Sequence, residues 1–407
     1  MSLSGLAMDL SPLRESRDFR LIYAGFLGAL VGTLMTSVAV AVQVYDMTAS
    51  PGQIGLVSLA RALPMVVGLL AGGVLADRFD RRRLMLLTRL PLVFVAAAMA
   101  GNALLPEPRL WVIYVATGLT GLFAGLGGPA MLAAIPALAG TAKLAAAGAL
   151  TAASAQLAAL VGPALGGALI AGPGLAACYV VDAAGFLIFS VVLCFVRPLP
   201  PVKSSTTSAK PREGVLGALR FIRGRRLILG LFLIDAAAVI FTMPQALYPV
   251  LADQQFGSPA VTGLLYAAPA LGAVVGALTS GWTGRAGGHA LIAAVLLWGL
   301  ALTGFGLTTF LPVALFLLAL AGLGDLISET LRSALLQRDT PDDLRGRVSS
   351  IWMVQATVSP ALGNAAVGFL AEVTGARQAV VIGGLVCVAA TLVVAATFPA
   401  LRRATQG

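Results

Sequence analysis

Three ionisable residues stand close together in the apolar stretch 311–336, namely Asp325, Glu329 and Arg332. A helix would place them on one face, because residues three and four positions apart are neighbours on its surface. Inside a membrane span such residues persist against a desolvation penalty and mark functional sites by default. Glu329 and Arg332 are spaced to form an ion pair, which makes the Asp325 carboxyl group a candidate proton carrier. The alternative is a static charge network that packs this helix against its neighbours.

Other apolar stretches hold isolated charges. Asp235 and Asp182 are further buried carboxylates, and the candidate proton carriers are therefore Asp325, Glu329, Asp235 and Asp182. Arg61 is a lone cation in the stretch 53–76. It would meet either Asp46 or an anionic group of a substrate, and the sequence leaves both possibilities open.

The composition indicates whether the helices that carry these charges lie in water or in lipid. The 407 residues are 58% hydrophobic and only 11% charged, whereas a soluble surface needs roughly a quarter of charged residues. The net charge of +10 would suggest nucleic acid in a soluble protein, but the basic residues fall between apolar runs instead of forming one patch. We therefore expect lipid as the partner, and no nucleic acid. The polar start with Arg14, Arg17 and Arg20 is not a cleavable signal, so the first helix is expected to be a permanent anchor.

The positions of the charges depend on membrane-spanning helices. Apolar runs of about 20 residues are long enough to cross a bilayer. The sequence predicts an all-α membrane protein with twelve such helices, near residues 20–45, 53–76, 84–105, 110–136, 144–171, 175–196, 227–251, 260–282, 289–309, 311–336, 347–370 and 378–400.

The basic residues predict the orientation of these helices. If the N-terminus is cytoplasmic, only Arg109 and Arg377 fall in outer loops, while Arg61, Arg89 and Arg332 lie within spans. The rest of the 27 lysine and arginine residues then fall on the inner side. The positive-inside rule therefore predicts that both termini are cytoplasmic.

The longest polar stretch, 197–226, divides the chain into two halves with six spans each. We expect an N-terminal six-helix bundle at 1–196, a cytoplasmic linker with an amphipathic basic end at 197–226, and a C-terminal six-helix bundle at 227–407. The linker contains the run Ser204–Ser208 and ends with Arg220, Arg223, Arg225 and Arg226. These arginines serve either simple retention of topology or a specific lipid or regulator site.

An internal repeat supports this division. At one constant shift, Gly55-Leu56 matches Gly263-Leu264, and Gly73 matches Gly281. The halves are thus expected to be parallel repeats with a substrate site between them. At the same shift Asp77 corresponds to Arg285, so the acidic residue is present only in the first half. We therefore expect the corresponding helix hairpins of the two halves to differ in function.

The segment from Gly73 to Arg83 is a dense charged turn between two apolar runs. Each Arg or Asp costs about 3 kcal/mol at the centre of a bilayer, so this turn must lie in water or among head groups. The motif residues are Gly73, Asp77, Arg78, Arg81 and Arg82. The segment resembles the loop between helices 2 and 3 of the major facilitator superfamily of secondary transporters, which implies the fold of that superfamily and a role in gating.

The chain contains few residues or motifs that could serve enzymatic catalysis. The single histidine, His289, has no obvious partner, and the three cysteines lie apart from one another with no metal-binding spacing. No phosphate-binding loop for ATP is present. We therefore expect no enzyme, no cofactor and no metal, and energy from an ion or substrate gradient.

Three more segments resemble one bacterial branch of the superfamily, which holds the enterobactin exporters and macrolide efflux pumps. They are Gln43–Thr48, Pro129–Pro136 and Leu336–Ser350. In these relatives the acid that matches Asp77 faces the N-terminus of helix 11, here near Gly346–Ser350, and latches the inner gate in the outward-facing state. Free backbone N–H groups and the helix dipole favour an anion at such a position.

Helix 5 carries a glycine and proline motif at Gly162, Pro163, Gly166 and Gly167. It resembles the antiporter motif of facilitator exporters, and the alternative is ordinary packing of small residues. Drug–proton antiporters of the superfamily commonly also carry Arg-x-x-Gln-Gly in helix 4, whereas Trp111–Gly128 has no arginine. The buried acids must therefore be weighed on their own as proton carriers.

The sequence thus predicts a monomeric efflux transporter in the bacterial cytoplasmic (inner) membrane. The resemblance implies an amphiphilic small molecule as substrate, such as a siderophore, a macrolide drug or a related metabolite, exported by proton antiport with alternating access. The alternative function is an importer or facilitator of a small metabolite. A receptor that transports nothing is disfavoured, because inward-facing acids would serve it poorly.

Overall fold

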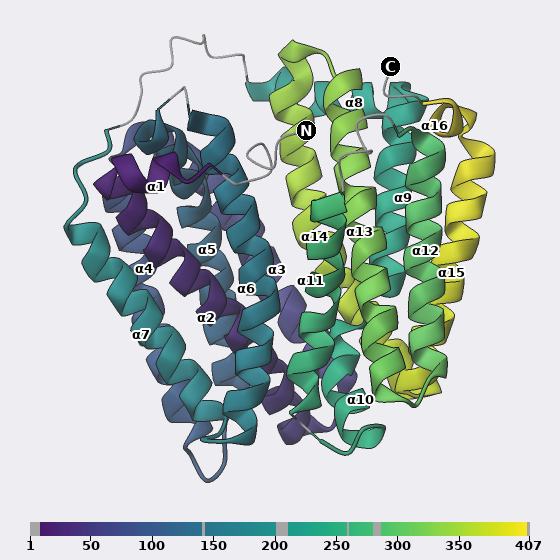
Figure 1. Ribbon diagram of the computed structural model, residues 1–407, viewed down its shortest axis with the longest axis horizontal. Coiled ribbons are helices and arrows are strands. Elements are labelled where there is room, and N and C mark those ends of the chain that lie inside the picture. Colours follow the sequence, from purple (N-terminus) through teal and green to yellow (C-terminus); the bar gives the residue numbers. More distant parts are fainter. Residues whose placement is uncertain (1–8, 141–142, 201–210, 259, 280–285, 405–407) are drawn as a thin grey trace. The chain divides into compact units, whose positions relative to one another are not determined.

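The computed structural model describes residues 9–140, 143–200, 211–258, 260–279 and 286–404 (Figure 1). In this part of the chain the regular structure is helical and contains no strand. The helices form two compact units. Unit 1 comprises Met1–Met47 and Ala60–Ser204, and unit 2 comprises Thr48–Leu59 and Ser205–Gly407.

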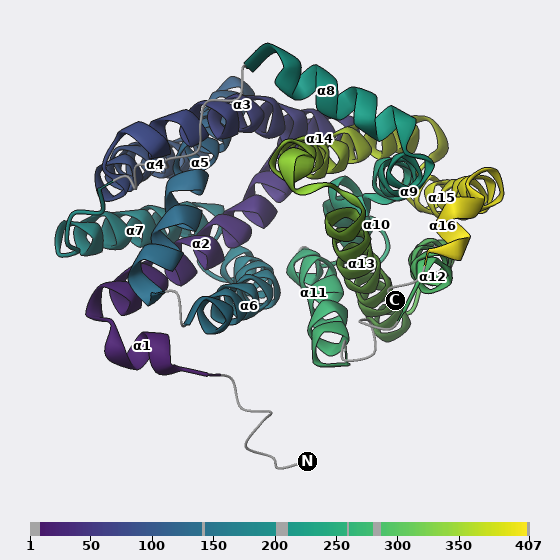
Figure 2. The ribbon, with the colours of Figure 1, turned by 90° about the horizontal axis from the view of Figure 1, so that it is seen from above.

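Unit 1 is built on one short helix and six long ones. In Figure 2 they surround α2 on several sides, with α4 and α7 adjacent to each other. Their bounds are α1 Ser11–Glu15, α2 Arg17–Thr48, α3 Pro51–Arg78, α4 Arg81–Ala103, α5 Leu110–Ala139, α6 Leu144–Ala171 and α7 Leu175–Cys194. The first part of α3, as far as Leu59, belongs to unit 2.

Unit 2 contains the remaining helices. Here α13 packs against both α11 and α12, and α9 packs against α14 and α15 (Figure 2). Their bounds are α8 Pro211–Gly224, α9 Arg226–Thr242, the 3₁₀ turn η3 Pro244–Leu247, α10 Tyr248–Gln254, α11 Val261–Thr279, α12 Gly288–Leu307, α13 Leu311–Asp339, α14 Asp342–Thr374, α15 Ala376–Thr397 and α16 Pro399–Arg403.

Each of the twelve expected spans coincides with a helix or a helical pair in the described residues. Eleven of these segments are long and apolar enough to cross a bilayer. The twelfth expected span lies in α14, which is 33 residues long but carries more polar residues, among them Gln355, Asn364 and Glu372. A chain with this many long apolar helices is a multi-pass membrane protein.

The outer surfaces of the helices fit this conclusion. Large apolar side chains are exposed along α4 and α7, including Leu87 at 68%, Phe94 at 69% and Ile188 at 61%. Soluble monomers rarely expose such continuous apolar surface, whereas lipid tails solvate it.

The expected span 227–251 is wrong as one continuous helix. α9 ends at Thr242, Met243 is extended, and Pro244 opens the 3₁₀ turn that leads into α10. Proline lacks the N–H that a helix interior needs and disfavours helical geometry in the residue before it. The segment Arg226–Gln254 is therefore a broken span.

The stretch 336–350, which joins the expected spans 311–336 and 347–370, is mostly helical. α13 continues to Asp339, and α14 begins at Asp342. Only Thr340 and Pro341 separate the two helices, because Pro341 holds Thr340 in an extended conformation and then starts a new helix.

Glycines allow unusually close helix contacts, as is common in membrane proteins. A Cβ atom on Gly72 of α3 would lie 2.5 Å from the carbonyl oxygen of Leu126 in α5. A Cβ atom on Gly68 of α3 would lie 2.3 Å from the carbonyl oxygen of Leu122 in α5. A Cβ atom on Gly125 of α5 would lie 2.2 Å from the carbonyl oxygen of Met65 in α3. The backbones of α3 and α5 therefore touch, and this contact fixes the position of Arg61 in unit 1.

The turn between α2 and α3 belongs to unit 2, where it packs on the end of α14. The Ser50 hydroxyl donates a hydrogen bond to Oε1 of Glu372, and the Gly52 N–H donates to the same oxygen at 3.3 Å. A carboxylate at the start of a helix interacts favourably with its free N–H groups and its dipole. Glu372 therefore secures the N-terminus of α3.

α8 occupies the end of the segment expected to be a linker. Ala218 and Ile222 are buried, while Leu216, Leu219, Arg220 and Arg223 are exposed, which is the expected amphipathic pattern. The run Ser204–Ser208 lies outside the described residues. The division of the chain at 197–226 stays a prediction.

Candidate functional site

Unit 2 contains a group of mutually bound charges, which we call the paired cluster: Asp235, Glu329, Arg332 and Gln355. Arg332 forms ion pairs with Asp235 at 2.7 Å and with Glu329 at 2.8 Å. Gln355 Nε2 donates to the second carboxylate oxygen of Asp235 at 2.7 Å. The cluster thus joins α9, α13 and α14.

The Arg332 side chain is only 1% exposed, and its guanidinium lies 5.7 Å from the centre of the Trp352 ring. A buried arginine is tolerated when carboxylates neutralise it. The expected pairing of Glu329 with Arg332 is formed, but Asp235 is a second partner from a distant part of the chain. Removing Glu329 therefore does not leave Arg332 unpaired, because Asp235 stays bound to it.

Asp325 lies on α13 one turn before Glu329 and is half-buried. It lies within electrostatic reach of Arg332, Glu329 and Asp235. No hydrogen bond or ion pair joins it to another residue that the structure describes. Among the carboxyl groups near the paired cluster, Asp325 is therefore the one left unbound.

Unit 1 contains a second group of charges, which we call the unpaired cluster: Asp182, Arg61 and Arg89. Asp182 on α7 is 4% exposed, and its Oδ2 accepts a hydrogen bond from the Thr36 hydroxyl of α2 at 2.8 Å. Its Oδ1 is buried and has no hydrogen-bond partner among the described residues. Gly32 makes room for this oxygen, because a Cβ there would lie 2.6 Å from it.

Both arginines interact electrostatically with Asp182, but neither comes within ion-pair distance of it. Arg89 of α4 lies with its guanidinium 5.8 Å from the centre of the Phe189 ring. Of the two partners left open for Arg61, Asp46 forms no ion pair with it in the described residues, and an anionic group of a substrate stays a prediction.

The charged turn after α3 has a clear structural role in unit 1. Arg82 donates from Nε to the Leu193 carbonyl at 2.7 Å and from Nη2 to the Cys194 carbonyl at 2.8 Å. These are the last carbonyls of α7, which have no partner within their own helix. Arg81 Nη1 donates to the Ala133 carbonyl of α5 at 2.8 Å, so the motif arginines tie helix ends together.

The acidic part of the motif is split between two roles. Asp80 begins α4, since its carboxylate accepts a hydrogen bond from the Arg83 N–H at 2.9 Å. Asp77 and Arg78 are exposed at the end of α3, and Asp77 accepts no hydrogen bond from another described residue of unit 1. Gly73 has no neighbour that a side chain would meet, so the glycine that packs tightly in this motif is Gly72.

The expected acceptor for Asp77 needs correction. Gly346–Ser350 lie inside α14, where the Ser350 hydroxyl donates to the Gly346 carbonyl at 2.9 Å. The helix starts one turn earlier, at Asp342, so its free N–H groups belong to the residues directly after Pro341. Asp342 itself stands in this first turn.

The glycine motif of helix 5 lies in α6 and packs on α2. Cβ atoms on Gly162 and Gly166 would lie 2.8 Å and 3.0 Å from the carbonyl oxygens of Val31 and Met35. Pro163 and Gly167 are buried beside them. This close contact is what small-residue packing predicts, and an exporter role of the motif stays a prediction.

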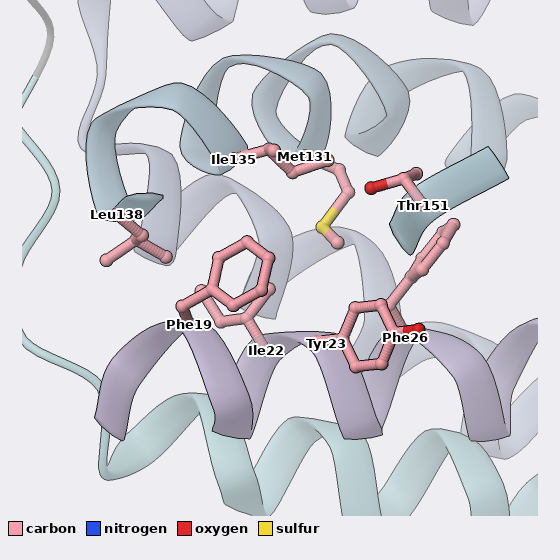
Figure 3. A pocket seen from close by; sticks show the side chains of 8 residues that line it. All are labelled: Phe19, Ile22, Tyr23, Phe26, Met131, Ile135, Leu138 and Thr151. Carbon is pink, nitrogen blue, oxygen red and sulfur yellow. The ribbon is translucent and has the colours of Figure 1, made fainter. Parts of the chain in front are cut away.

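One apolar pocket lies in unit 1 between α2, α5 and α6 (Figure 3). Figure 3 shows aromatic side chains of α2 on one side and Met131 pointing into the space from α5. The cavity volume of about 10 Å³ holds about one water molecule. It is far too small for a siderophore. The residues that line it are Phe19, Ile22, Tyr23, Phe26, Met131, Ile135, Leu138 and Thr151.

Three contributors to the clusters were missed by sequence reasoning. Arg89 is an arginine within a span and was open to the same argument as Arg61. Thr36 and Gln355 carry no signal, because uncharged polar residues are ordinary in apolar helices. Their contribution depends on contacts between helices that are far apart in the sequence.

Comparisons with known proteins agree with this architecture. Residues 7–405 match the family model described as transmembrane secretion effector. The chain is 38% identical to the enterobactin exporter EntS of Citrobacter koseri, covering 95% of this chain and 94% of that protein. It is 36% identical to the protein of the same name from Shigella boydii, covering 91% and 89%.

Solved structures share the fold at low sequence identity. A peptide transporter POT in complex with alafosfalin matches with a TM-score of 0.75 and 15% identity, over 96% of each chain. The nucleoside transporter NupG matches with a TM-score of 0.74 and 11% identity, over 94% of this chain and 99% of that one. The predicted all-α major facilitator fold is confirmed, as is the prediction that the chain is no enzyme. The chain belongs to the transmembrane secretion effector family and is an efflux transporter of the major facilitator superfamily.

Proposed function

We propose that this transporter exports a siderophore of the enterobactin kind or a similar amphiphilic molecule. The observation that carries this proposal is the 38% identity, over 95% of the chain, to a protein named enterobactin exporter. Charged side chains within the spans of both units supply the polar groups that such a substrate and its driving ion require.

Transport proceeds by alternating access and is driven by exchange for protons. Asp325 is the proton carrier in this proposal, because its carboxyl group is within a span and bound by no described residue. Asp235 suits the role poorly, since Arg332 and Gln355 hold both of its oxygens. Glu329 is likewise bound to Arg332, and Asp182 is the alternative carrier.

Asp77 serves the inner gate in this proposal. Its carboxylate is exposed at the end of α3, while Arg81 and Arg82 of the same motif are engaged within unit 1. The acid is therefore, with the neighbouring exposed Arg78, available for a contact made in only one state of the transport cycle. The transporter acts as a monomer.

The protein lies in the bacterial inner membrane with both termini in the cytoplasm, as the distribution of basic residues indicates. A phosphatase reporter fused after Gly407, and one inserted at Ser205, are expected to be inactive because neither is exported. Matching cytoplasmic reporters at the same positions should be active. Phosphatase activity at either position would overturn the orientation.

The export proposal is tested in an Escherichia coli strain whose own enterobactin exporter is deleted. Expression of this chain is expected to lower the enterobactin retained in the cells and to raise the amount in the medium. An empty vector is the control. Unchanged retention with a normal amount of the protein in the membrane would contradict export of this substrate.

A further inference from the structure

The helix α8 of unit 2 is too short to cross a membrane. Its 14 residues reach about 21 Å, whereas the hydrocarbon core of a bilayer is about 30 Å thick. Arg225 follows in an extended conformation, and the spanning helix α9 begins at Arg226. Figure 2 shows α8 lengthwise and α9 nearly end-on, so the chain turns sharply between them. α8 is therefore tied to the end of a span, where the bilayer meets water.

The two faces of α8 have different surroundings. Ala218 and Ile222 are buried, and α8 contacts α9 and α14 of the same unit. The other face follows the spacing i, i+3, i+4 and i+7, which places its residues on one stripe of a helix. This outer face is exposed and consists of Leu216, Leu219, Arg220 and Arg223.

Positive charge gathers at the turn from α8 to α9. Segment 211–226 carries five arginines and a single acidic residue, Glu213. Arg345 of α14 pairs with Asp342 at 2.7 Å, but no such ion pair joins the arginines of the turn to a side chain that the structure describes. The four exposed arginines of this turn are Arg220, Arg223, Arg225 and Arg226.

Exposed leucines beside exposed arginines fit a partner with two kinds of surface. Guanidinium groups bind phosphate oxygens through paired hydrogen bonds. Leu216 is 64% exposed and Leu219 41%, and acyl chains solvate such side chains whereas water does not. An anionic phospholipid offers both surfaces at the level of the bilayer where α8 lies. A soluble anion would leave the leucines in water, and a zwitterionic lipid would leave the positive charge uncompensated.

We propose that the outer face of α8, with the arginines of its turn into α9, binds the head group of an anionic phospholipid and lays Leu216 and Leu219 among its acyl chains. Retention of topology requires positive charge on one side of the membrane, but no ordered stripe on a helix. The leaflet that supplies the lipid follows from the proposed orientation of the termini, whereas the binding itself does not depend on it.

The test uses the purified full-length protein in micelles of dodecyl maltoside, an uncharged detergent. The probes are dioleoyl phosphatidylglycerol and dioleoyl phosphatidylcholine, which share their acyl chains and differ in the net charge of the head group. Native mass spectrometry counts the lipid molecules bound at each concentration. The wild-type protein is expected to bind its first phosphatidylglycerol more tightly than its first phosphatidylcholine, and equal binding of the two would contradict the proposal.

Arg220→Gln combined with Arg223→Gln is expected to weaken binding of the first phosphatidylglycerol about 25-fold, because each arginine near an anionic surface changes the affinity about fivefold. Phosphatidylcholine binding should stay unchanged, and so should thermal unfolding without lipid, because both side chains point away from unit 2. Arg220→Lys combined with Arg223→Lys keeps the charges and should lose far less. Unchanged phosphatidylglycerol binding by the glutamine variant would overturn the proposal and leave these arginines to topology or to a protein partner.

Arg338→Gln combined with Arg345→Gln is the matched control. It also removes two exposed arginines of unit 2, but these are paired with Asp339 and Asp342. Phosphatidylglycerol binding should stay unchanged in this variant. An equal loss in both double variants would show that only the net charge matters and would contradict a site on α8.

The leucines and the acyl chains are tested separately. Leu216→Ser is expected to weaken the binding of both lipids, and unchanged binding would overturn the contact with acyl chains. Glycerophosphoglycerol, the head group without acyl chains, should not displace bound phosphatidylglycerol from the wild type. Displacement at similar concentrations would show a site for a soluble phosphate compound instead of a lipid.

These measurements need neither a substrate nor a proton gradient. Failure of enterobactin export, or of the reporters to confirm the orientation, would leave the lipid site standing. Failure of the glutamine variant to lose phosphatidylglycerol would leave the export proposal standing.

Discussion

Arg332 in unit 2 is held by two carboxylates, whereas Arg61 and Arg89 in unit 1 share one carboxylate at a distance. The paired cluster satisfies its charges with side chains from three helices. The unpaired cluster leaves Oδ1 of Asp182 without a hydrogen-bond partner among the described residues, whereas both carboxylate oxygens of Asp235 in the paired cluster are bound. Both groups lie within spans, so burial alone does not tell a structural charge from a functional one.

Pairing is what separates a structural charge from a functional one in this protein. A fully paired charge lowers the energy of one arrangement of helices and resists change. A charge without a partner adds little to stability and is free to bind a proton or an anion. The same difference occurs within α13: Asp325 is bound by no described residue, whereas Glu329, one turn later, is bound to Arg332.

Arg332→Met is expected to have the largest effect. It leaves Asp235 as a buried carboxylate without its cation, which costs about 3–5 kcal/mol of unfolding free energy. Thermal unfolding of the detergent-purified protein measures the loss. Arg89→Met is the matched control and should cost no more than about 1 kcal/mol, since it breaks no ion pair. The comparison fails if the two substitutions destabilise equally.

Asp77→Asn is expected to reduce the export rate about fivefold with little change in the amount of folded protein. It removes the charge proposed for the inner gate and keeps the volume, and a weakened helix-terminus contact of about 1 kcal/mol changes an equilibrium severalfold. Export from cells, normalised to membrane protein, measures this effect. Arg285→Ala, at the matching position of the second repeat and outside the described residues, should have a milder effect. Normal export by Asp77→Asn would refute the gate.

Glu329→Gln is expected to have the smallest effect. The Glu329 side chain is 47% exposed and Arg332 keeps its pair with Asp235, so the loss should be about 1 kcal/mol or less. Thermal unfolding beside Arg332→Met gives the comparison. A loss as large as that of Arg332→Met would show that Glu329, and not Asp235, neutralises the arginine.

Much of this structure could be predicted from the sequence. The apolar runs gave the helices, because bilayer thickness sets their length. The spacing of Glu329 and Arg332 gave their ion pair, because a helix alone brings them together. The break at Pro244 follows from proline chemistry, although the run of apolar residues on both sides concealed it.

The rest depends on contacts between distant helices. No local pattern tells that Asp235 binds Arg332, or that Arg61 and Arg89 both interact electrostatically with Asp182. Which of the two neighbouring glycines packs against α5 depends on the rotation of α3 about its axis. In this structure it is Gly72 and not Gly73. The start of α14 could likewise not be predicted exactly. The helix begins at Asp342, so its free N–H groups lie one turn before Gly346, where they were expected.

Proton-driven transport by Asp325→Asn in everted membrane vesicles, with Glu329→Gln in parallel, tests directly whether Asp325 is the proton carrier. Enterobactin uptake into the vesicles is measured with and without an imposed proton gradient. We expect Asp325→Asn to lose the gradient-driven part and to keep downhill exchange, whereas Glu329→Gln keeps both. Gradient-driven transport at the wild-type rate by Asp325→Asn would show that Asp325 does not carry the proton, and would make Asp182 the next candidate.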